Sequence, residues 1–110
     1  MPKKFAYMIT HDVEAEPSKY DVDDKILREY IYMNVEAFNK AVREEFFNFL
    51  SARFKFDARV LDADDIEEMK ETDEEDGTDI WTYSFDTDVD GEAVHVKEVC
   101  FMSVRIELKE

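Results

Sequence analysis

The sequence predicts an α+β fold in which an antiparallel sheet of three or four strands packs against one long helix. Three observations support this prediction. Apolar residues alternate near the N-terminus, recur at helical spacing in the middle of the chain, and flank an Asp-Gly turn near the C-terminus. We expect residues 1–110 to form a single domain, because the composition shows no break and Gly and Pro number only two each.

The first predicted element is a strand over residues 4–12, where apolar side chains alternate between two sides. Residues 13–22 contain Pro17 and are expected to form a loop. Helical structure is expected over residues 23–33, because two aspartates at their start favour a helix N-terminus.

The main helix is predicted over residues 35–53. Across both predicted helical stretches, apolar residues follow three- and four-residue steps over more than six turns, which is typical of a helix with one buried face. They are Leu27, Ile31, Val35, Phe38, Val42, Phe46 and Phe49. Asn34 can divide this run into two helices, so the long helix can be kinked there, and residues 30–33 also have the composition of a strand.

The C-terminal part is predicted to be a β-hairpin, preceded by a short strand over residues 56–60. Asp90 and Gly91 are the residue types of a tight two-residue turn. This turn fixes the expected partners across the hairpin. They are Val89 with Glu92, Phe85 with Val96, and Trp81 with Cys100.

The last strand is long and is expected to be bent or bulged near residues 97–99. Its even-numbered apolar residues share one predicted face, which only Glu98 interrupts. They are Val94, Val96, Cys100, Met102, Val104, Ile106 and Leu108. The core should form where this face meets the helix stripe. The residues expected in it are Phe38, Val42, Phe46, Trp81, Val96 and Val104.

Charge is the outlying feature of the composition. Twenty-nine Asp and Glu residues face fourteen Lys and Arg residues, for a formal net charge of −15. Direct binding to a nucleic acid or an anionic membrane would oppose the dominant electrostatic force, whereas a basic protein would be attracted. The expected partner is therefore a basic protein, such as a nucleic-acid-binding protein or a nuclease.

The densest charge lies in the acidic segment, residues 62–79, which contains eleven carboxylates and one base, Lys70. The carboxylates belong to Asp62, Asp64, Asp65, Glu67, Glu68, Glu71, Asp73, Glu74, Glu75, Asp76 and Asp79. As a helix, the segment would carry roughly one charge per 2.5 Å, against one per ~1.7 Å on duplex DNA. We predict that these eleven residues bind the partner, although a solvated acidic loop fits the pattern equally well.

Two smaller acidic clusters accompany this segment. The first consists of Asp12, Glu14, Glu16, Asp21, Asp23 and Asp24. The second consists of Asp86, Asp88, Asp90 and Glu92. The second resembles the opening of a calcium loop, but Lys97 stands where that loop needs its bidentate Glu, which favours a hairpin turn.

No pattern indicates catalysis, and no cofactor or metal is expected. His11 and His95 are far apart in the sequence and make a poor zinc set with Cys100. No serine lies in a glycine-flanked elbow. A single cysteine excludes an internal disulfide, and neither a signal peptide nor a membrane span is evident, so the chain is expected to be soluble and cytoplasmic.

In size and charge the chain resembles DNA-mimic proteins, such as those that phages use against restriction, CRISPR or repair enzymes. This resemblance of class implies an acidic inhibitor or decoy that occupies the basic nucleic-acid groove of another protein. An anti-restriction protein, an anti-CRISPR protein and a nuclease immunity protein are versions of this hypothesis. The alternatives are an assembly module that self-associates, for example as a homodimer, with acid only for solubility, and a calcium-responsive module.

Overall fold

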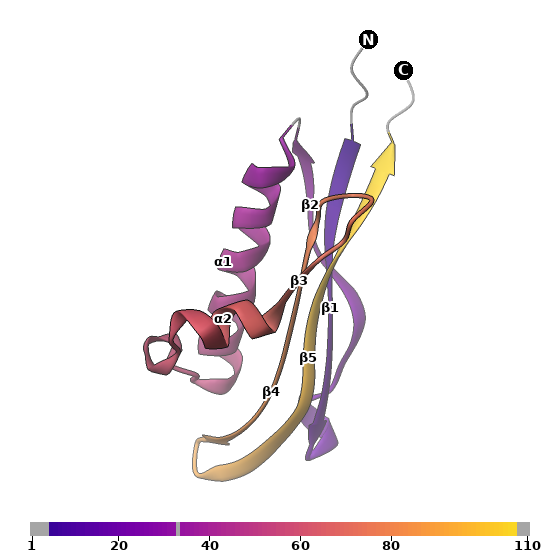
Figure 1. Ribbon diagram of the computed structural model, residues 1–110. Helices are drawn as coiled ribbons and strands as arrows, with labels where there is room; N and C mark the ends of the chain where they lie inside the picture. Colours follow the sequence, from indigo (N-terminus) through magenta and orange to yellow (C-terminus); the bar gives the residue numbers. More distant parts are fainter. Residues whose placement is uncertain (1–4, 33, 108–110) are drawn as a thin grey trace.

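The computed structural model describes residues 5–32 and 34–107, with the backbone alone at residues 24–32. Within these residues, five strands form one antiparallel sheet in the order β2-β1-β5-β4-β3, and a long helix lies along one face of it (Figure 1). The elements are β1 (Phe5–Glu16), a 3₁₀ turn (Ser18–Tyr20), β2 (Val22–Tyr32), α1 (Val35–Phe54), a second 3₁₀ turn (Ala58–Val60), α2 (Ala63–Met69), β3 (Lys70–Thr72), β4 (Asp79–Val89) and β5 (Glu92–Glu107). The predicted α+β class is confirmed, and the sheet has more strands than expected.

The main helix, α1, forms where the sequence predicts it. Asn34 caps its N-terminus, because the Asn34 side chain accepts a hydrogen bond of 2.8 Å from the backbone N–H of Glu36. Lys55 ends the helix in the left-handed conformation, with φ of 54°. The buried stripe repeats every four residues and has no exposed surface. It consists of Phe38, Val42, Phe46, Leu50 and Phe54.

The chain before α1 is a strand, so the helix predicted over residues 23–33 is wrong for its described part. β2 pairs with β1 along its length, for example Tyr30 with Tyr7. Leu27 and Ile31 continue the helical spacing, but strand pairing with β1 overrides that local signal. Asn34 therefore caps one helix and does not divide two, and residue 33 lies outside the described residues.

The first strand is longer than predicted and takes up part of the expected loop at residues 13–22. β1 runs to Glu16, because Val13 and Ala15 continue the alternation and are both buried. The expected strand at residues 56–60 is also wrong. That segment contains a 3₁₀ turn, whose start is capped by Asp57 through a 3.0 Å hydrogen bond from the Arg59 N–H.

The C-terminal hairpin is confirmed. Asp90 and Gly91 both have positive φ, 52° and 85°, as a type I′ turn requires. The partners Val89 with Glu92 and Phe85 with Val96 are also as expected. Trp81, however, pairs with Phe101 and not with Cys100.

A bulge in β5 explains this shift of one residue. The register slips between Tyr83 and Phe85 on one side of β5 and between Glu14 and Ala15 on the other, which places the bulge at residues 97–98, as predicted. A slip of one residue turns every later side chain to the opposite face.

The slip changes which residues of β5 reach the core. Val99 and Phe101 are buried, whereas Met102, Val104 and Ile106 are 45%, 39% and 43% exposed. The prediction of Val104 as a core residue is therefore wrong, and Leu108 lies outside the described residues. The other five predicted core residues are buried.

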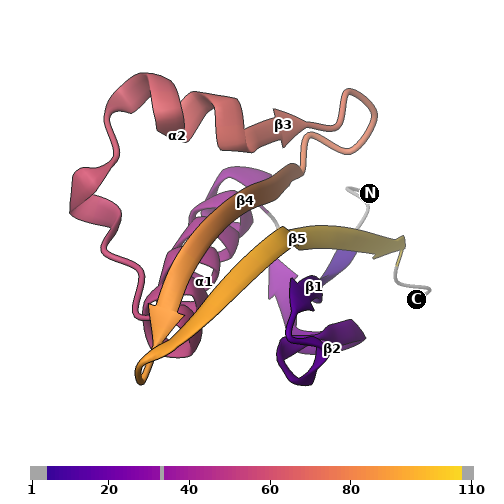
Figure 2. The same cartoon turned by 90° about the horizontal axis from the view of Figure 1, so that it is seen from below.

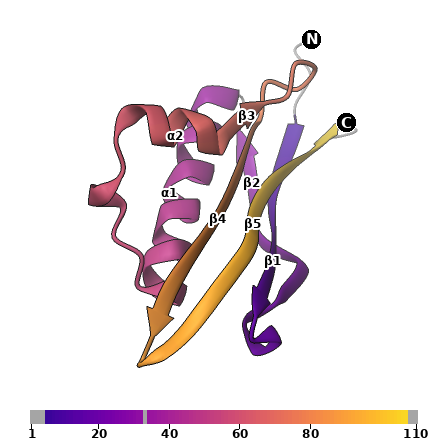
Figure 3. The same cartoon turned by 60° about the horizontal axis from the view of Figure 1, so that its bottom comes forward.

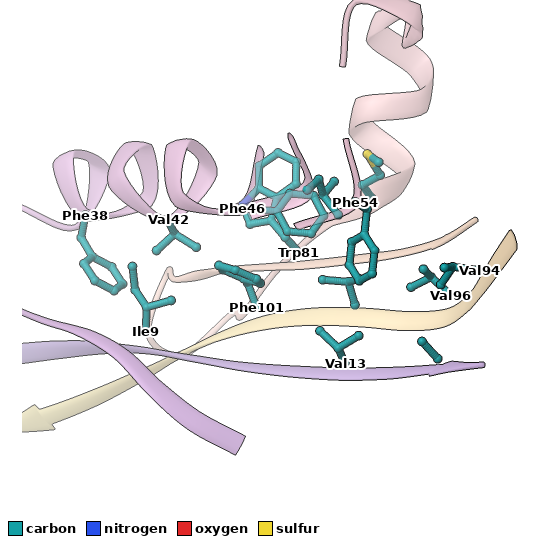
Figure 4. Packing of buried hydrophobic residues seen from close by; sticks show 14 of the residues in the cluster. Ile9, Val13, Phe38, Val42, Phe46, Phe54, Trp81, Val94, Val96 and Phe101 are labelled. Atoms are coloured by element: carbon teal, nitrogen blue, oxygen red, sulfur yellow. The ribbon is translucent and has the colours of Figure 1, made fainter. Parts of the chain in front are cut away.

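The core lies between α1 and the inner face of the sheet (Figure 4). Phe46 stacks on Trp81 with ring centroids 5.4 Å apart and meets Phe101 edge-on at 5.5 Å. The opposite face of the sheet, called the outer face below, carries the even-numbered residues of β1 and β4. β4 and β5 curve together past α1 (Figure 3). Within the described residues, no helix has the length and apolar composition needed to cross a lipid bilayer.

Candidate partner-binding surface

The acidic segment folds into α2, β3 and a turn, so it is not a loop without structure. Asp62 and Asp65 form a capping box at the start of α2. The Asp62 carboxylate accepts the Asp65 backbone N–H at 2.9 Å, and the Asp65 carboxylate accepts the Asp62 N–H at 3.1 Å. These two carboxylates thus satisfy backbone donors that would otherwise lack partners.

The turn that follows β3 is held by Asp73 and Asp76. One carboxylate oxygen of Asp73 accepts the backbone N–H groups of Glu75 and Asp76, both at 2.9 Å. The Asp76 carboxylate lies 2.8 Å from the guanidinium of Arg105, and both side chains are about 70% buried. This ion pair ties the turn to the end of β5.

The end of the segment is anchored to α1 and β3. The Asn39 side chain donates to the carbonyl of Gly77 at 2.8 Å and accepts from the Asp79 N–H at 2.9 Å. The Asp79 carboxylate in turn accepts from the Thr72 hydroxyl at 2.7 Å. The C-terminal part of the segment is therefore fixed to the rest of the domain.

The eleven predicted binding residues divide into structural and available groups. Eight are exposed, whereas Asp73, Asp76 and Asp79 are half-buried. Five of these eleven carboxylates have neither a hydrogen bond nor an ion pair with any described residue. They belong to Asp64, Glu68, Glu71, Glu74 and Glu75. The exposed Glu67 carboxylate lies 3.6 Å from the ammonium of the half-buried Lys70.

The other two acidic clusters partly merge on the outer face. β5 lies between β1 and β4 in the sheet, so acidic residues of these strands lie on either side of it. The exposed carboxylates gathered there are those of Asp12, Glu14, Glu16, Asp86, Asp88 and Glu98. The bases among them on β5 are Lys97 and His95.

Lys97 and His95 each hold a carboxylate of a neighbouring strand. The Lys97 ammonium lies 3.0 Å from Glu16, and this hydrogen bond and charge keep the pKa of the Glu16 carboxyl below its usual range. His95 Nδ1 lies 2.5 Å from the Asp86 carboxylate. In the predicted cluster of Asp86, Asp88, Asp90 and Glu92, Asp90 binds Lys55 at the hairpin turn, away from the outer face.

Glu98 connects the outer face to the acidic segment. It lines a groove of about 480 Å³ together with Asp65 and Glu68 of α2. It also lines a second groove of about 360 Å³ with Asp12 and Glu14 of β1. The sequence did not single out this residue for binding, and the bulge in β5 is what places it between the two grooves.

We call the combined surface the acidic band. It runs from α2 across the outer face to the start of β2, where the second groove ends. Its members are Asp65, Glu68, Glu98, Asp12, Glu14, Asp21 and Asp23. The part from β4 to β2 crosses three inter-strand steps, or about 14 Å.

The geometry favours the hairpin interpretation of the aspartates near residue 90. Asp86 and Asp88 lie two residues apart on an extended strand, about 7 Å along its length, which spreads their carboxylates. Within the described residues, no three His, Cys, Asp or Glu side chains form a group that could hold a metal ion. The half-buried His11 packs against Phe49 and Phe101 on the inner face of the sheet, while His95 is exposed on the outer face.

The chain matches no known family model, no curated protein and no solved structure. The properties of its own surface are therefore the basis for a functional proposal. The most distinctive of these properties is the acidic band.

Proposed function

We propose that this protein is a cytoplasmic, non-catalytic inhibitor or decoy that binds the basic nucleic-acid-binding surface of another protein. A phage protein directed against restriction or CRISPR enzymes and a nuclease immunity protein are both of this kind. The acidic band is the observation that carries the proposal, because it joins the acidic segment to the outer face. A net charge of −15 would attract such a partner over a distance.

Fixed carboxylates suit this function better than mobile ones. The capping box and the Asp76–Arg105 pair hold the segment in place, so less conformational entropy is lost when a partner binds. Many of the carboxylates remain exposed and can meet Lys and Arg side chains. Such contacts are screened by salt, and each contributes little by itself.

A charge-reversal variant tests the proposal. We would change Asp64, Glu68, Glu71 and Glu75 to Lys, because they have no partner within the described residues. Asp65 is left unchanged, since it caps α2. A partner captured with the wild-type protein should bind the wild type tightly at low salt and weakly at high salt. It should hardly bind the quadruple variant. If the folded variant binds the partner as tightly as the wild type does at both salt concentrations, the proposal is refuted.

A second pair of variants separates the effect of where a charge lies from the effect of the total net charge on binding. Glu36 and Glu44 lie exposed on α1, on the opposite side of the sheet from the outer face. The double variants Glu68→Lys/Glu71→Lys and Glu36→Lys/Glu44→Lys change the net charge equally. Only the first should weaken binding strongly, and binding of the wild type should compete with DNA or RNA for the partner.

A second candidate function, self-association, is favoured by one observation. Met102, Val104 and Ile106 form an exposed apolar row on the outer face, where Val104 is paired with Met8 of β1. An assembly module would use this row to form a homodimer. In that case sedimentation should show dimers that persist at high salt and that Val104→Glu dissociates.

A further inference from the structure

We infer that the free edge of β4 binds an extended basic segment of the partner as an additional strand of the sheet. This inference rests on the proposed function, because the edge lies beside the acidic band and the segment would belong to the same partner. It goes further than the proposed function because it names β4 as the backbone element along which the partner's segment pairs. Strand addition of this kind uses main-chain hydrogen bonds for affinity and alternate side chains for specificity.

The edge of β4 is open over most of its length. β3 pairs only with residues 79–81 of β4, ending at the pair of Lys70 with Trp81. From Thr82 to Val89, β5 is the only strand beside β4 in the described part of the chain. No other backbone group of the described residues is hydrogen-bonded to the backbone of this stretch, although the Thr87 hydroxyl donates to the Phe54 carbonyl at 3.2 Å. The open edge spans about 27 Å, and its free N–H and C=O groups can pair with another chain.

The preceding segment packs beside this edge but leaves its main-chain groups without a backbone partner in the described residues. Phe56, between α1 and α2, packs its ring on those of Tyr83 and Phe85, with centroids 5.4 and 5.1 Å apart, while β3 covers only the beginning of β4 (Figure 2). The groove of about 480 Å³ lies along the open stretch, since Thr82, Tyr83 and Ser84 contribute to its lining. Its size falls within the range of roughly 300–1,000 Å³ that ligand sites occupy.

The lining of the groove specifies what can occupy it. Leu61 and Met69 provide apolar surface next to Tyr83, whereas Asp65, Glu68 and Glu98 are acidic. Among the described residues that line it, there is no Lys or Arg. Side chains of an added strand point alternately to the two sides of the sheet. The best occupant is therefore an extended segment in which Lys or Arg alternates with apolar residues.

A second copy of the chain fits this edge poorly. Pairing two β4 edges would bring the exposed Asp86 and Asp88 of both copies close together on one face. Like charges facing each other across strands are destabilising, and charged residues on an edge prevent such pairing in natural sheets. The same charges attract a basic segment, so they select the partner as well as prevent self-pairing.

Synthetic peptides of about nine residues test the inference. The probe alternates Lys and Val, with both ends blocked. One control peptide has the same side chains but is N-methylated along its backbone, which removes its hydrogen-bond donors and keeps its charge. A second control has Glu in place of Lys. Binding at low salt is followed by amide NMR shifts and hydrogen exchange of the full chain.

We expect the Lys-Val peptide to shift and protect the amides between Thr82 and Val89, and the N-methylated peptide to bind at least ~10-fold more weakly. The Glu peptide should not bind. The protein variant Glu68→Gln/Glu98→Gln should also weaken binding ~5-fold or more, whereas Glu44→Gln should not.

Three results would overturn the inference. They are equal binding of the N-methylated peptide, shifts that map away from β4, and no binding of the Lys-Val peptide. If one of these results occurs but the quadruple Lys variant still loses the natural partner, only the inference about β4 is refuted and the proposed function stands. If the Lys-Val peptide adds to β4 as a strand but the quadruple Lys variant still binds the natural partner, only the proposed function is refuted.

Discussion

Truncation of Phe46 to Ala tests the packing of α1 on the sheet most directly. The Phe46 side chain has no exposed surface and its ring meets three others, those of Phe47, Trp81 and Phe101, at centroid distances of 5.3–5.5 Å. Removing a fully packed Phe costs about 3–5 kcal/mol, because both burial and contacts are lost and a cavity remains. A small domain has only about 5–15 kcal/mol of stability in total, so the loss is large.

Urea unfolding followed by circular dichroism measures this loss. With a slope of about 2 kcal/mol/M, a destabilisation of about 4 kcal/mol lowers the midpoint by about 2 M. Val60 is 73% exposed, so Val60→Ala serves as a control that should change stability by less than ~0.5 kcal/mol. A loss below about 1 kcal/mol for Phe46→Ala, with an unchanged slope, would show that the stripe is not packed as described.

Three further predictions concern the hairpin and the outer face. Calcium in the low millimolar range should barely change the melting temperature, because the carboxylates of Asp86 and Asp88 are spread along a strand. A rise of several degrees in the melting temperature that Asp88→Ala abolishes would contradict this prediction. Gly91→Ala should lower the free energy of unfolding in urea by about 1–2 kcal/mol, because φ at this position is +85°, while no neighbouring atom adds a clash. An unchanged urea midpoint would refute the turn geometry. NMR titration should give Glu16 a pKa below that of an ordinary Glu, owing to the hydrogen bond and charge of Lys97, and Lys97→Met should raise it. Since the pKa of Glu16 is lowered in the folded state, the Glu16–Lys97 pair stabilises the fold at pH values above the ordinary Glu pKa. This contribution is lost as the pH falls through the lowered pKa. An unshifted Glu16 pKa would count against the pairing.

The candidate surface could be predicted only in part. The sequence identifies the eleven carboxylates by their density, but not which of them serve the fold. Asp62, Asp65 and Asp73 satisfy backbone donors, and Asp76 pairs with a residue of β5, whereas Glu71 remains available. These roles depend on where backbone N–H groups and distant side chains lie, which density alone does not reveal.

The sequence by itself determined the elements whose signals are local. α1 follows from a repeating apolar stripe, and the hairpin follows from Asp90 and Gly91, since only such residues readily adopt positive φ at both turn positions. These interactions join residues that are close along the chain, so a short stretch contains the whole signal.

The tertiary structure decided everything that depends on pairing between distant strands. Residues 22–32 have apolar residues at helical spacing, yet they form a strand because β1 pairs with them. The bulge in β5 turns Val104 outward and places Glu98 between two grooves, because a one-residue slip reverses every later side chain. Strand order likewise brings Glu14 and Asp86 to one face, although 71 residues separate them in the sequence. The sequence indicated a bulge near residues 97–99, but which residues pair beyond it depends on partners far away in the chain, and no local pattern encodes that pairing.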